Sequence, residues 1–286
     1  MLKKKAYLSI FLAAMIWGGG FVATSYALEQ IPAMATLAIR FTLSAIVLFI
    51  FGYKTILKAH KDELIKTAPL GIFLFLAFYF QTIGNAATTV SNNSFLTALN
   101  VVFTPFIASV ILKTKTDRKD YLASLLALLG VALLTMSSVN LSFNMGDLYS
   151  LIGAVFFALH VVFSSKAKDV GTLLTTFMQM VVAGMISLVA SLIIDDYSFL
   201  ATLNLSSVVS IGYLVIFSTL IAYLLQLFAS KTLSPTALSV VLSTEALFAT
   251  LFGIILLGEK ITVKSGISMG LLMLAVVMSS SKKSNV

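Results

Sequence analysis

Runs of about 18 or more apolar residues recur along the whole chain and are separated by short polar segments. A helix rises about 1.5 Å per residue, so about 20 such residues cross a bilayer core about 30 Å thick. The pattern therefore predicts ten membrane-spanning helices. Their ranges are 6–28, 34–53, 67–86, 91–112, 121–138, 147–166, 172–194, 206–229, 234–257 and 264–280.

Composition supports the same interpretation. Of the 286 residues, 59% are hydrophobic and 10% charged, against roughly a quarter charged in soluble domains; the mean hydropathy is +1.04. We expect an all-α integral membrane protein in the lipid bilayer. The chain has no cysteine, which excludes disulfides, thiolate metal sites and a cysteine nucleophile. We expect no cofactor and no metal.

The basic residues predict the orientation of the chain. With a cytoplasmic N-terminus, the segments on the same side hold 16 of the 19 Lys and Arg residues. Basic flanks resist translocation, so both termini are expected to be cytoplasmic, in a plasma (inner) membrane. The net charge of +8 reports this topology. A nucleic-acid partner is not expected, because the basic residues form no stripe.

The first apolar run also resembles a signal peptide, since three lysines precede it and Ser25-Tyr26-Ala27 is an acceptable cleavage site. The run is longer than the usual 7–15 residues. We therefore expect an uncleaved first span.

The two halves of the chain share a weak internal similarity. A shift of 145 residues places Gln81 on Gln226 and Asn100 on Glu245, and a shift of 139 places Arg40 on Gln179. Five spans in each half is an odd number, so the second half enters the membrane from the opposite side. The sequence predicts two inverted five-helix repeats, residues 1–140 and 141–286, with a midplane binding site and alternating access.

Polar residues form stripes on three predicted spans, at spacings of three and four that place them on one helix face. The stripes are Gln81, Asn85 and Thr88; Asn93, Thr97, Asn100 and Thr104; and Thr219, Tyr223, Gln226 and Ser230. Hydrogen bonds between helices would explain any single member. Amides on three helices at matching depth favour a hydrated substrate path.

Among the ionisable residues of the predicted spans, three are candidates for a functional role. Glu245 suits proton coupling or a cationic substrate, but it points away from its helix's small polar face and could instead brace a neighbouring helix. Arg40 could attract a carboxylate or phosphate, or clamp backbone carbonyls. His160 is a proton or substrate candidate whose alternative is a structural hydrogen bond.

Glycines mark two places of close approach. Gly18, Gly19 and Gly20 remove side chains from most of one turn, which permits close packing or bending in a gating element, beside the aromatic Trp17. Gly266 and Gly270 form a GxxxG pair that suggests a packing or homodimer surface.

Several segments resemble the EamA-type, ten-span branch of the drug/metabolite transporter superfamily. They are "IWGGGFVATSYAL" at 16–28, the arginine of "IPAMATLAIRF" at 31–41, and "LSTEALFATLFGIILLGEKIT" at 242–262. Ala246 stands where the family has proline, which predicts a straighter ninth span. "LKTKTD" at 112–117 replaces the Leu-Gly-Glu pattern in the first half.

The resemblance implies movement, with export favoured, of a small metabolite such as an amino acid, amine or drug. It implies a cavity lined by spans one, three, four, six, eight and nine, with spans five and ten peripheral. The expected path residues are Trp17, Arg40, Gln81, Asn85, Thr97, Asn100, His160, Tyr223, Gln226 and Glu245. The alternatives are a channel or structural subunit and an enzyme. An enzyme is disfavoured because no HExxH, paired aspartates or GxSxG occurs at membrane depth.

Overall fold

A computed structural model describes residues 2–87, 90–113, 117–135, 144–257 and 263–280. Every regular element within these residues is helical. The elements are α1 Leu2–Leu28, α2 Ala33–Ile56, α3 Lys61–Ala87, α4 Val90–Ala98, α5 Asn100–Leu112, α6 Arg118–Thr135, α7 Met145–Ser164, η1 Ser165–Ala167, α8 Thr172–Ile194, η2 Tyr197–Ala201, α9 Leu205–Tyr213, η3 Leu214–Ile221, α10 Ala222–Ser230, α11 Pro235–Leu242, α12 Glu245–Leu257 and α13 Val263–Ser280.

Seven helical stretches are long and apolar enough to cross a membrane. They are Leu2–Leu28, Ala33–Ile56, Lys61–Gly84, Phe95–Leu112, Met145–Ala167, Thr172–Ile194 and Leu205–Ser230. Two shorter apolar helices, Pro235–Ala249 and Gly266–Ser279, fall within the ninth and tenth predicted spans. The fifth predicted span, 121–138, extends beyond the described part of α6. The all-α, multi-pass membrane class is thus confirmed.

Local signals fix several helix ends. Asn144 and Asp147 form a capping box at the start of α7, each side chain accepting a backbone N–H of the other. Ser234 caps α11, and Pro235 occupies its first position. At the C-terminal end of α5, Lys113 adopts a left-handed conformation with φ 52°.

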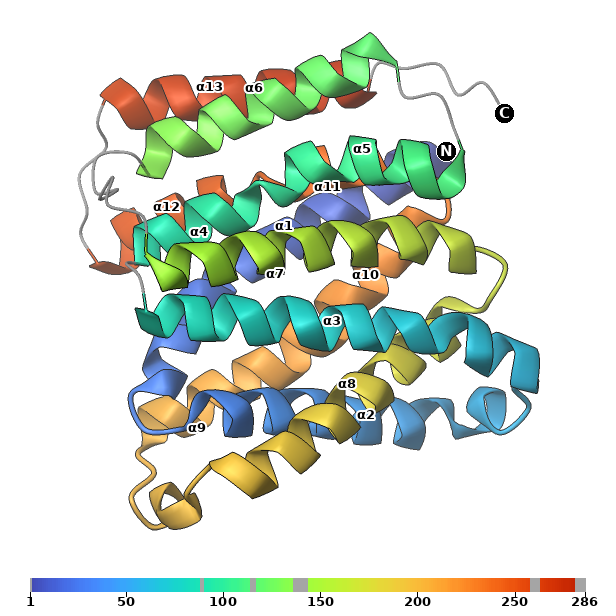
Figure 1. The fold of residues 1–286 in the computed structure, drawn as a ribbon, viewed down its shortest axis with the longest axis vertical. Helices are drawn as coiled ribbons and strands as arrows, with labels where there is room; N and C mark the ends of the chain where they lie inside the picture. Colours follow the sequence, from blue (N-terminus) through green and yellow to red (C-terminus); the bar gives the residue numbers. More distant parts are fainter. Residues whose placement is uncertain (1, 88–89, 114–116, 136–143, 258–262, 281–286) are drawn as a thin grey trace.

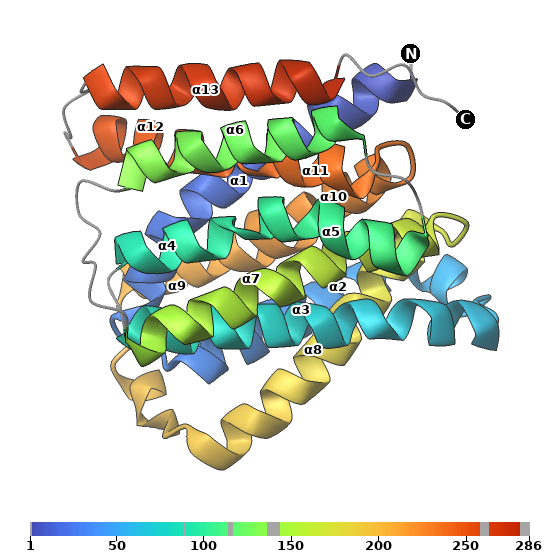
Figure 2. The same ribbon diagram turned by 45° about the horizontal axis from the view of Figure 1, so that its top comes forward.

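Neighbours along the chain are often not neighbours in space (Figure 1). α2 packs on α8, and α3 packs on α7. α1 packs on α10 and α12, and α5 packs on α7 and α11. α6 and α13 pack on each other and lie at one edge of the bundle in both views (Figure 2). This placement agrees with the expectation that these two helices are peripheral.

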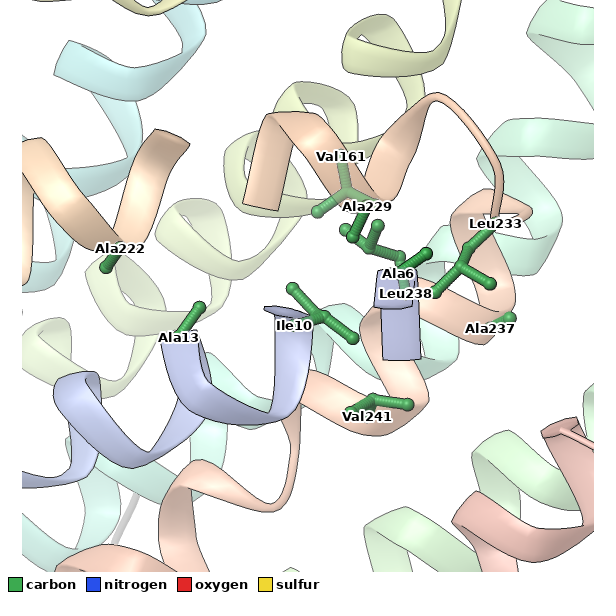
Figure 3. Packing of buried hydrophobic residues seen from close by; sticks show 10 residues of the cluster. All are labelled: Ala6, Ile10, Ala13, Val161, Ala222, Ala229, Leu233, Ala237, Leu238 and Val241. Atoms are coloured by element: carbon green, nitrogen blue, oxygen red, sulfur yellow. The ribbon is translucent and has the colours of Figure 1, made fainter. Parts of the chain in front are cut away.

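Small residues line the packing surface around α1. Figure 3 shows Ala6, Ile10 and Ala13 of α1 among buried side chains of α7, α10 and α11. Lipid provides little hydrophobic drive between helices, so close van der Waals packing of small residues holds such interfaces together. The large apolar side chains that remain exposed, such as Phe51 and Ile193, suit contact with lipid.

Three long helical paths are irregular. Leu99 interrupts the helix between α4 and α5, and Ser243-Thr244 interrupts it between α11 and α12. The interruption of the ninth span is present with alanine at position 246. The expectation that this span is straighter than the family norm stays a prediction. Between α9 and α10, η3 is a π-helix, a distortion found often at functional sites.

Candidate functional site

Arg40 of α2 is buried against the π-helical segment η3. Its guanidinium donates from Nε to Thr219 Oγ1 at 2.8 Å and from an Nη atom to Ser218 Oγ at 3.2 Å. The same group lies over the ring of Phe78 of α3, 4.5 Å from the ring centroid. Only 4% of Arg40 is exposed, so a permanent charge is held between α2, α3 and η3.

The π-helix offers acceptors to two further side chains. Trp17 Nε1 of α1 donates to the Ser218 carbonyl at 2.7 Å, and Ser44 Oγ of α2 donates to the Val215 carbonyl at 2.9 Å. A π-helix shifts the usual i to i−4 pairing, which leaves carbonyls available to neighbouring helices. The distortion therefore connects α1 and α2 to the eighth predicted span.

Tyr223 forms the centre of an aromatic group below this segment. Its ring meets Trp17 edge-on at 5.0 Å and His160 edge-on at 5.7 Å between centroids. His160 Nε2 lies 2.9 Å from Gln179 Oε1, and both side chains are buried. This geometry supplies the structural hydrogen bond that the sequence left open for His160, and it still places the ring beside Tyr223.

A small cavity of about 40 Å³ adjoins Arg40. Its walls come from the ends of α1 and α3 and from α2, and they include Gln81, Thr24, Thr36 and Thr82. Gln81 makes no hydrogen bond with any described residue. Two predicted site residues, Arg40 and Gln81, thus share one cavity.

Three other predicted residues have unused polar groups. Gln226 is 1% exposed, and its side-chain oxygen has no partner among the described residues. Glu245 and Asn100 are the first residues of α12 and α5, directly after the two helix interruptions. The carboxylate of Glu245 makes no ion pair or hydrogen bond within the described part of the chain.

Thr97 belongs to a different group. It donates to Asn93 Oδ1 at 3.4 Å, and the same oxygen accepts from Ser150 Oγ of α7 at 2.8 Å. These bonds connect α4 to α7 and are the packing alternative for this stripe. The side chain of Asn85, and Thr88 as a whole, lie outside the described residues.

Gly18, Gly19 and Gly20 face three different neighbours. A Cβ at Gly18 would lie 2.6 Å from Phe248 Cβ and 2.8 Å from the backbone nitrogen of Ala249, both in α12. A Cβ at Gly19 would lie 2.7 Å from Tyr213 Oη, and one at Gly20 would lie 3.1 Å from Ser218 Oγ. These three glycines let α1 approach α12, α9 and η3 closely.

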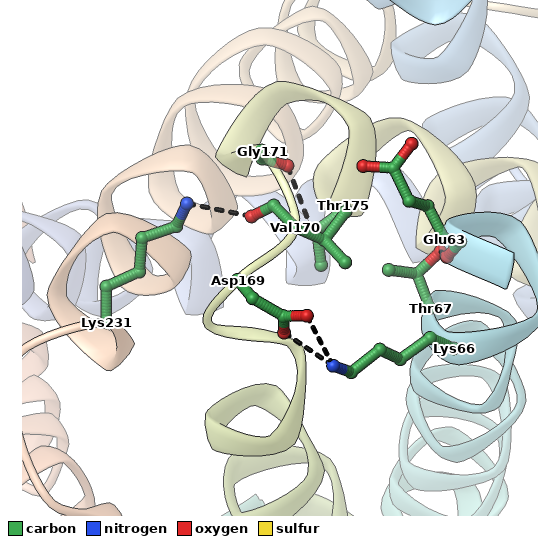
Figure 4. Close-up of polar contacts among 8 residues, drawn as sticks. All are labelled: Glu63, Lys66, Thr67, Asp169, Val170, Gly171, Thr175 and Lys231. Atoms are coloured by element: carbon green, nitrogen blue, oxygen red, sulfur yellow. Dashed lines mark hydrogen bonds and ion pairs between the residues drawn. The ribbon is translucent and has the colours of Figure 1, made fainter. Parts of the chain in front are cut away.

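Charged residues at the far end of α3 connect it to the segment before α8 (Figure 4). Lys66 Nζ lies 2.5 Å and 2.6 Å from the two carboxylate oxygens of Asp169. Lys231 Nζ donates to the Val170 carbonyl at 2.8 Å. The hydrogen bond from Lys66 lowers the pKa of the Asp169 carboxyl below its ordinary value.

The sequence pattern did not predict Ser218, Ser44 or Gln179 as site residues. Gln179 carried a signal, because the 139-residue shift aligned it with Arg40. Ser218 and Ser44 gave no comparable signal, since their importance comes from a π-helix that apolar spacing does not predict. Within the described ranges, no cluster of three His, Asp or Glu residues is suited to hold a metal ion.

Comparisons with known proteins agree with this architecture. The family model described as "EamA-like transporter family" matches twice, over residues 4–136 and 144–281. An uncharacterized transporter of Archaeoglobus fulgidus is 28% identical over 276 residues, covering 95% of this chain and 84% of that protein. The Escherichia coli K12 protein named uncharacterized inner membrane transporter YedA is 25% identical, covering 94% and 89%. One solved crystal structure has the same fold, with a TM-score of 0.82, 16% identity and 96% coverage of each chain.

Proposed function

The chain belongs to the EamA-like transporter family, and on that premise we propose that it is a secondary or facilitative carrier of a small organic metabolite, such as an amino acid, amine or drug. Transport is by alternating access around polar groups between the two halves of the chain, and the direction we propose is export. The carrying observation is the convergence of Arg40, Trp17 and Tyr223, from three helices, on or beside the π-helical segment.

The pattern of helix packing supports two inverted repeats, residues 1–140 and 141–286. In that arrangement α1 corresponds to α7, α3 to α10 and α5 to α12. Exchanging equivalents turns the α3–α7 packing into α10 on α1, and the α5–α7 packing into α12 on α1; all four occur. The pairs α2–α8 and α6–α13 are each exchanged with themselves.

The helix interruptions support the same repeat. Leu99 and Thr244 are 145 residues apart, the shift that aligns the polar stripes. Asn100 and Glu245 then begin equivalent half-helices. In transporters with inverted repeats, such discontinuous helices direct their ends toward the substrate near the midplane. We propose that the two interruptions flank the path.

Glu245 is the proposed proton or cation site. It starts α12, within one turn of the residues that pack on Gly18. Proton coupling through this carboxylate would join charge movement to rearrangement of the α1–α12 contact.

We also propose that the protein resides in the plasma membrane with both termini cytoplasmic, as the distribution of basic residues favours. A homodimer through α13 is part of the proposal. A Cβ at Gly266 or Gly270 would meet no atom of the described residues within 4 Å, so this GxxxG face is open to a partner helix.

Flux into proteoliposomes tests the proposal. Purified protein is reconstituted and assayed with amino acids and amines, with and without a pH gradient. Saturable, gradient-dependent flux is expected, whereas non-saturating flux would identify a channel. Absence of flux for every solute would refute the carrier.

Glu245→Gln tests the role of the carboxylate. We expect it to abolish thermal stabilisation by a cationic substrate or the response of flux to pH. The matched control is Glu29→Gln, which changes an exposed carboxylate outside the helices. If both variants behave like the parent protein, Glu245 is not the coupling site.

A further inference from the structure

We propose that Arg40 is the receptor for a carboxylate group of the transported solute, with the adjoining cavity as the binding place for that group. This inference rests on the proposed function, and it specifies the chemistry of the substrate. It assigns the carboxylate end of the solute to the site formed by α2, α3 and η3.

The counter-charge for Arg40 is missing among the described residues. Arg40 is 4% exposed, and no carboxylate of a described residue lies within ion-pair distance of it. Burying an unpaired charge is expensive, and isolated buried ions are normally paired or bound to a ligand. Glu245, the carboxylate predicted within a span, forms no ion pair with the guanidinium in the described part of the chain.

Among the described residues, Arg40 donates to side-chain hydroxyls and not to backbone carbonyls. A structural clamp would donate to backbone carbonyls at a helix end, but both acceptors among the described residues are the hydroxyls of Ser218 and Thr219. Of the five N–H donors of a guanidinium, two are used. The remaining donors are those that a carboxylate could accept in a two-pronged hydrogen bond.

The guanidinium of Arg40 is held in place by contacts on two sides. Phe78 supports it from one side at 4.5 Å, and the two hydroxyls fix it from another. Orientation by packing and hydrogen bonds reduces the entropy lost when a ligand binds. Arg40 is therefore preorganised for a planar anion.

The small cavity beside the guanidinium carries further polar groups. It borders Arg40 and adds the amide of Gln81 and the hydroxyls of Thr36 and Thr24. The Gln81 amide and the Thr24 hydroxyl can donate to an oxyanion beside the guanidinium, whereas the Thr36 hydroxyl donates to the Ile31 carbonyl. A volume of about 40 Å³ suits a carboxylate group and not an entire metabolite, so the rest of the solute must lie beyond it when the path opens.

The test compares solutes that differ in the carboxylate alone. Unmodified protein in proteoliposomes is offered L-amino acids, the corresponding amino-acid amides and the corresponding amines, and inorganic phosphate is added as a competitor. We expect the acids to be transported with at least tenfold higher kcat/KM than the amides. Equal transport of acids and amides would overturn the inference and leave the carrier intact. Preferential inhibition by phosphate over added carboxylates would assign the site to phosphate and would also overturn it.

Variants locate the preference at Arg40. Arg40→Gln is expected to abolish the preference for acids, and Arg40→Lys to retain part of it. Arg118→Gln is the matched control, because Arg118 is exposed at the start of the peripheral α6. Retention of the full preference in a folded Arg40→Gln protein would overturn the inference. If that variant does not fold, the acid and amide comparison in the unmodified protein still decides. Absence of transport for all solutes would refute the proposed function and this inference with it.

Discussion

Substituting alanine for Gly18 tests the close contact between α1 and α12. The added Cβ would lie 2.6 Å from Phe248 Cβ, 2.8 Å from the Ala249 backbone nitrogen and 3.0 Å from the Glu245 carbonyl oxygen. Two of these atoms belong to the backbone and the third is a Cβ, so none can move without moving α12. We expect the helices to separate or the local packing to distort.

The magnitude follows from two opposed effects. Glycine-to-alanine replacement in a helix gains about 1 kcal/mol from backbone propensity. Overpacking a well-filled interface costs about 1–3 kcal/mol. Gly212→Ala in α9 is the matched control, because its Cβ would meet no described atom within 4 Å. The propensity gain is common to both variants, so their difference isolates the clash at about 1–3 kcal/mol.

Thermal unfolding of both variants in one detergent measures this difference. Gly18→Ala should unfold several degrees below Gly212→Ala, at about 2–4 °C per kcal/mol. If Gly18→Ala is as stable as Gly212→Ala, the close approach of α1 and α12 is wrong.

Three further predictions concern hydrogen bonds and charge. Gln179→Leu leaves His160 without its buried partner and should reduce the free energy of unfolding by about 1–3 kcal/mol; thermal unfolding checks this, and no change would contradict the bond. Asn93→Ala removes the link to Ser150 and should cost only about 0.6 kcal/mol, so a loss above 2 kcal/mol by the same assay would mean that Asn93 does more than join α4 to α7. Lys66 lowers the pKa of Asp169, so the small stabilisation from this exposed pair is present above the unfolded pKa of about 4 and is lost as pH falls through the folded pKa. Asp169→Asn should therefore reduce stability near pH 7 but not at strongly acid pH. Melting temperature measured against pH checks this.

Apolar spacing was sufficient to predict the membrane class, because crossing a bilayer demands long uninterrupted runs. Arg40 was selected as a charge within such a run, Trp17 as the aromatic neighbour of three glycines, and Tyr223 as a member of a polar stripe. Their roles in transport stay predictions. The partners of these residues could not be predicted. Ser218 and Ser44 are ordinary in composition, and only the packing of α2 on η3 brings them to Arg40 and to the Val215 carbonyl.

The stripes show a second limit. Helical spacing places Thr97 and Asn100 on one face, but it does not say which helix that face meets. The structure directs Thr97 to Asn93, which in turn joins α7, while Asn100 begins α5 after an interruption. Side chains of one stripe thus have different surroundings, because the helix is broken between them.

Ala246 offers a final test, of the interruption before α12. The first helical bond of α12 runs from the Phe248 nitrogen to the Thr244 carbonyl, so Ala246 lies in the first turn. Its own nitrogen makes a turn-type bond of 3.3 Å to the Ser243 carbonyl. Proline is tolerated in a first turn but costs about 3 kcal/mol or more inside a helix.

Ala246→Pro should therefore leave the protein folded with a modest loss of stability, whereas Leu251→Pro, farther along α12, should unfold or fail to accumulate. Melting temperature and yield of the two variants in parallel measure the contrast. The same reasoning explains why a proline after the glutamate is compatible with this fold, since the helix is already interrupted there with alanine. If Ala246→Pro is as damaging as Leu251→Pro, the helix is continuous through Thr244, and the equivalence of Asn100 and Glu245 as half-helix starts fails with it.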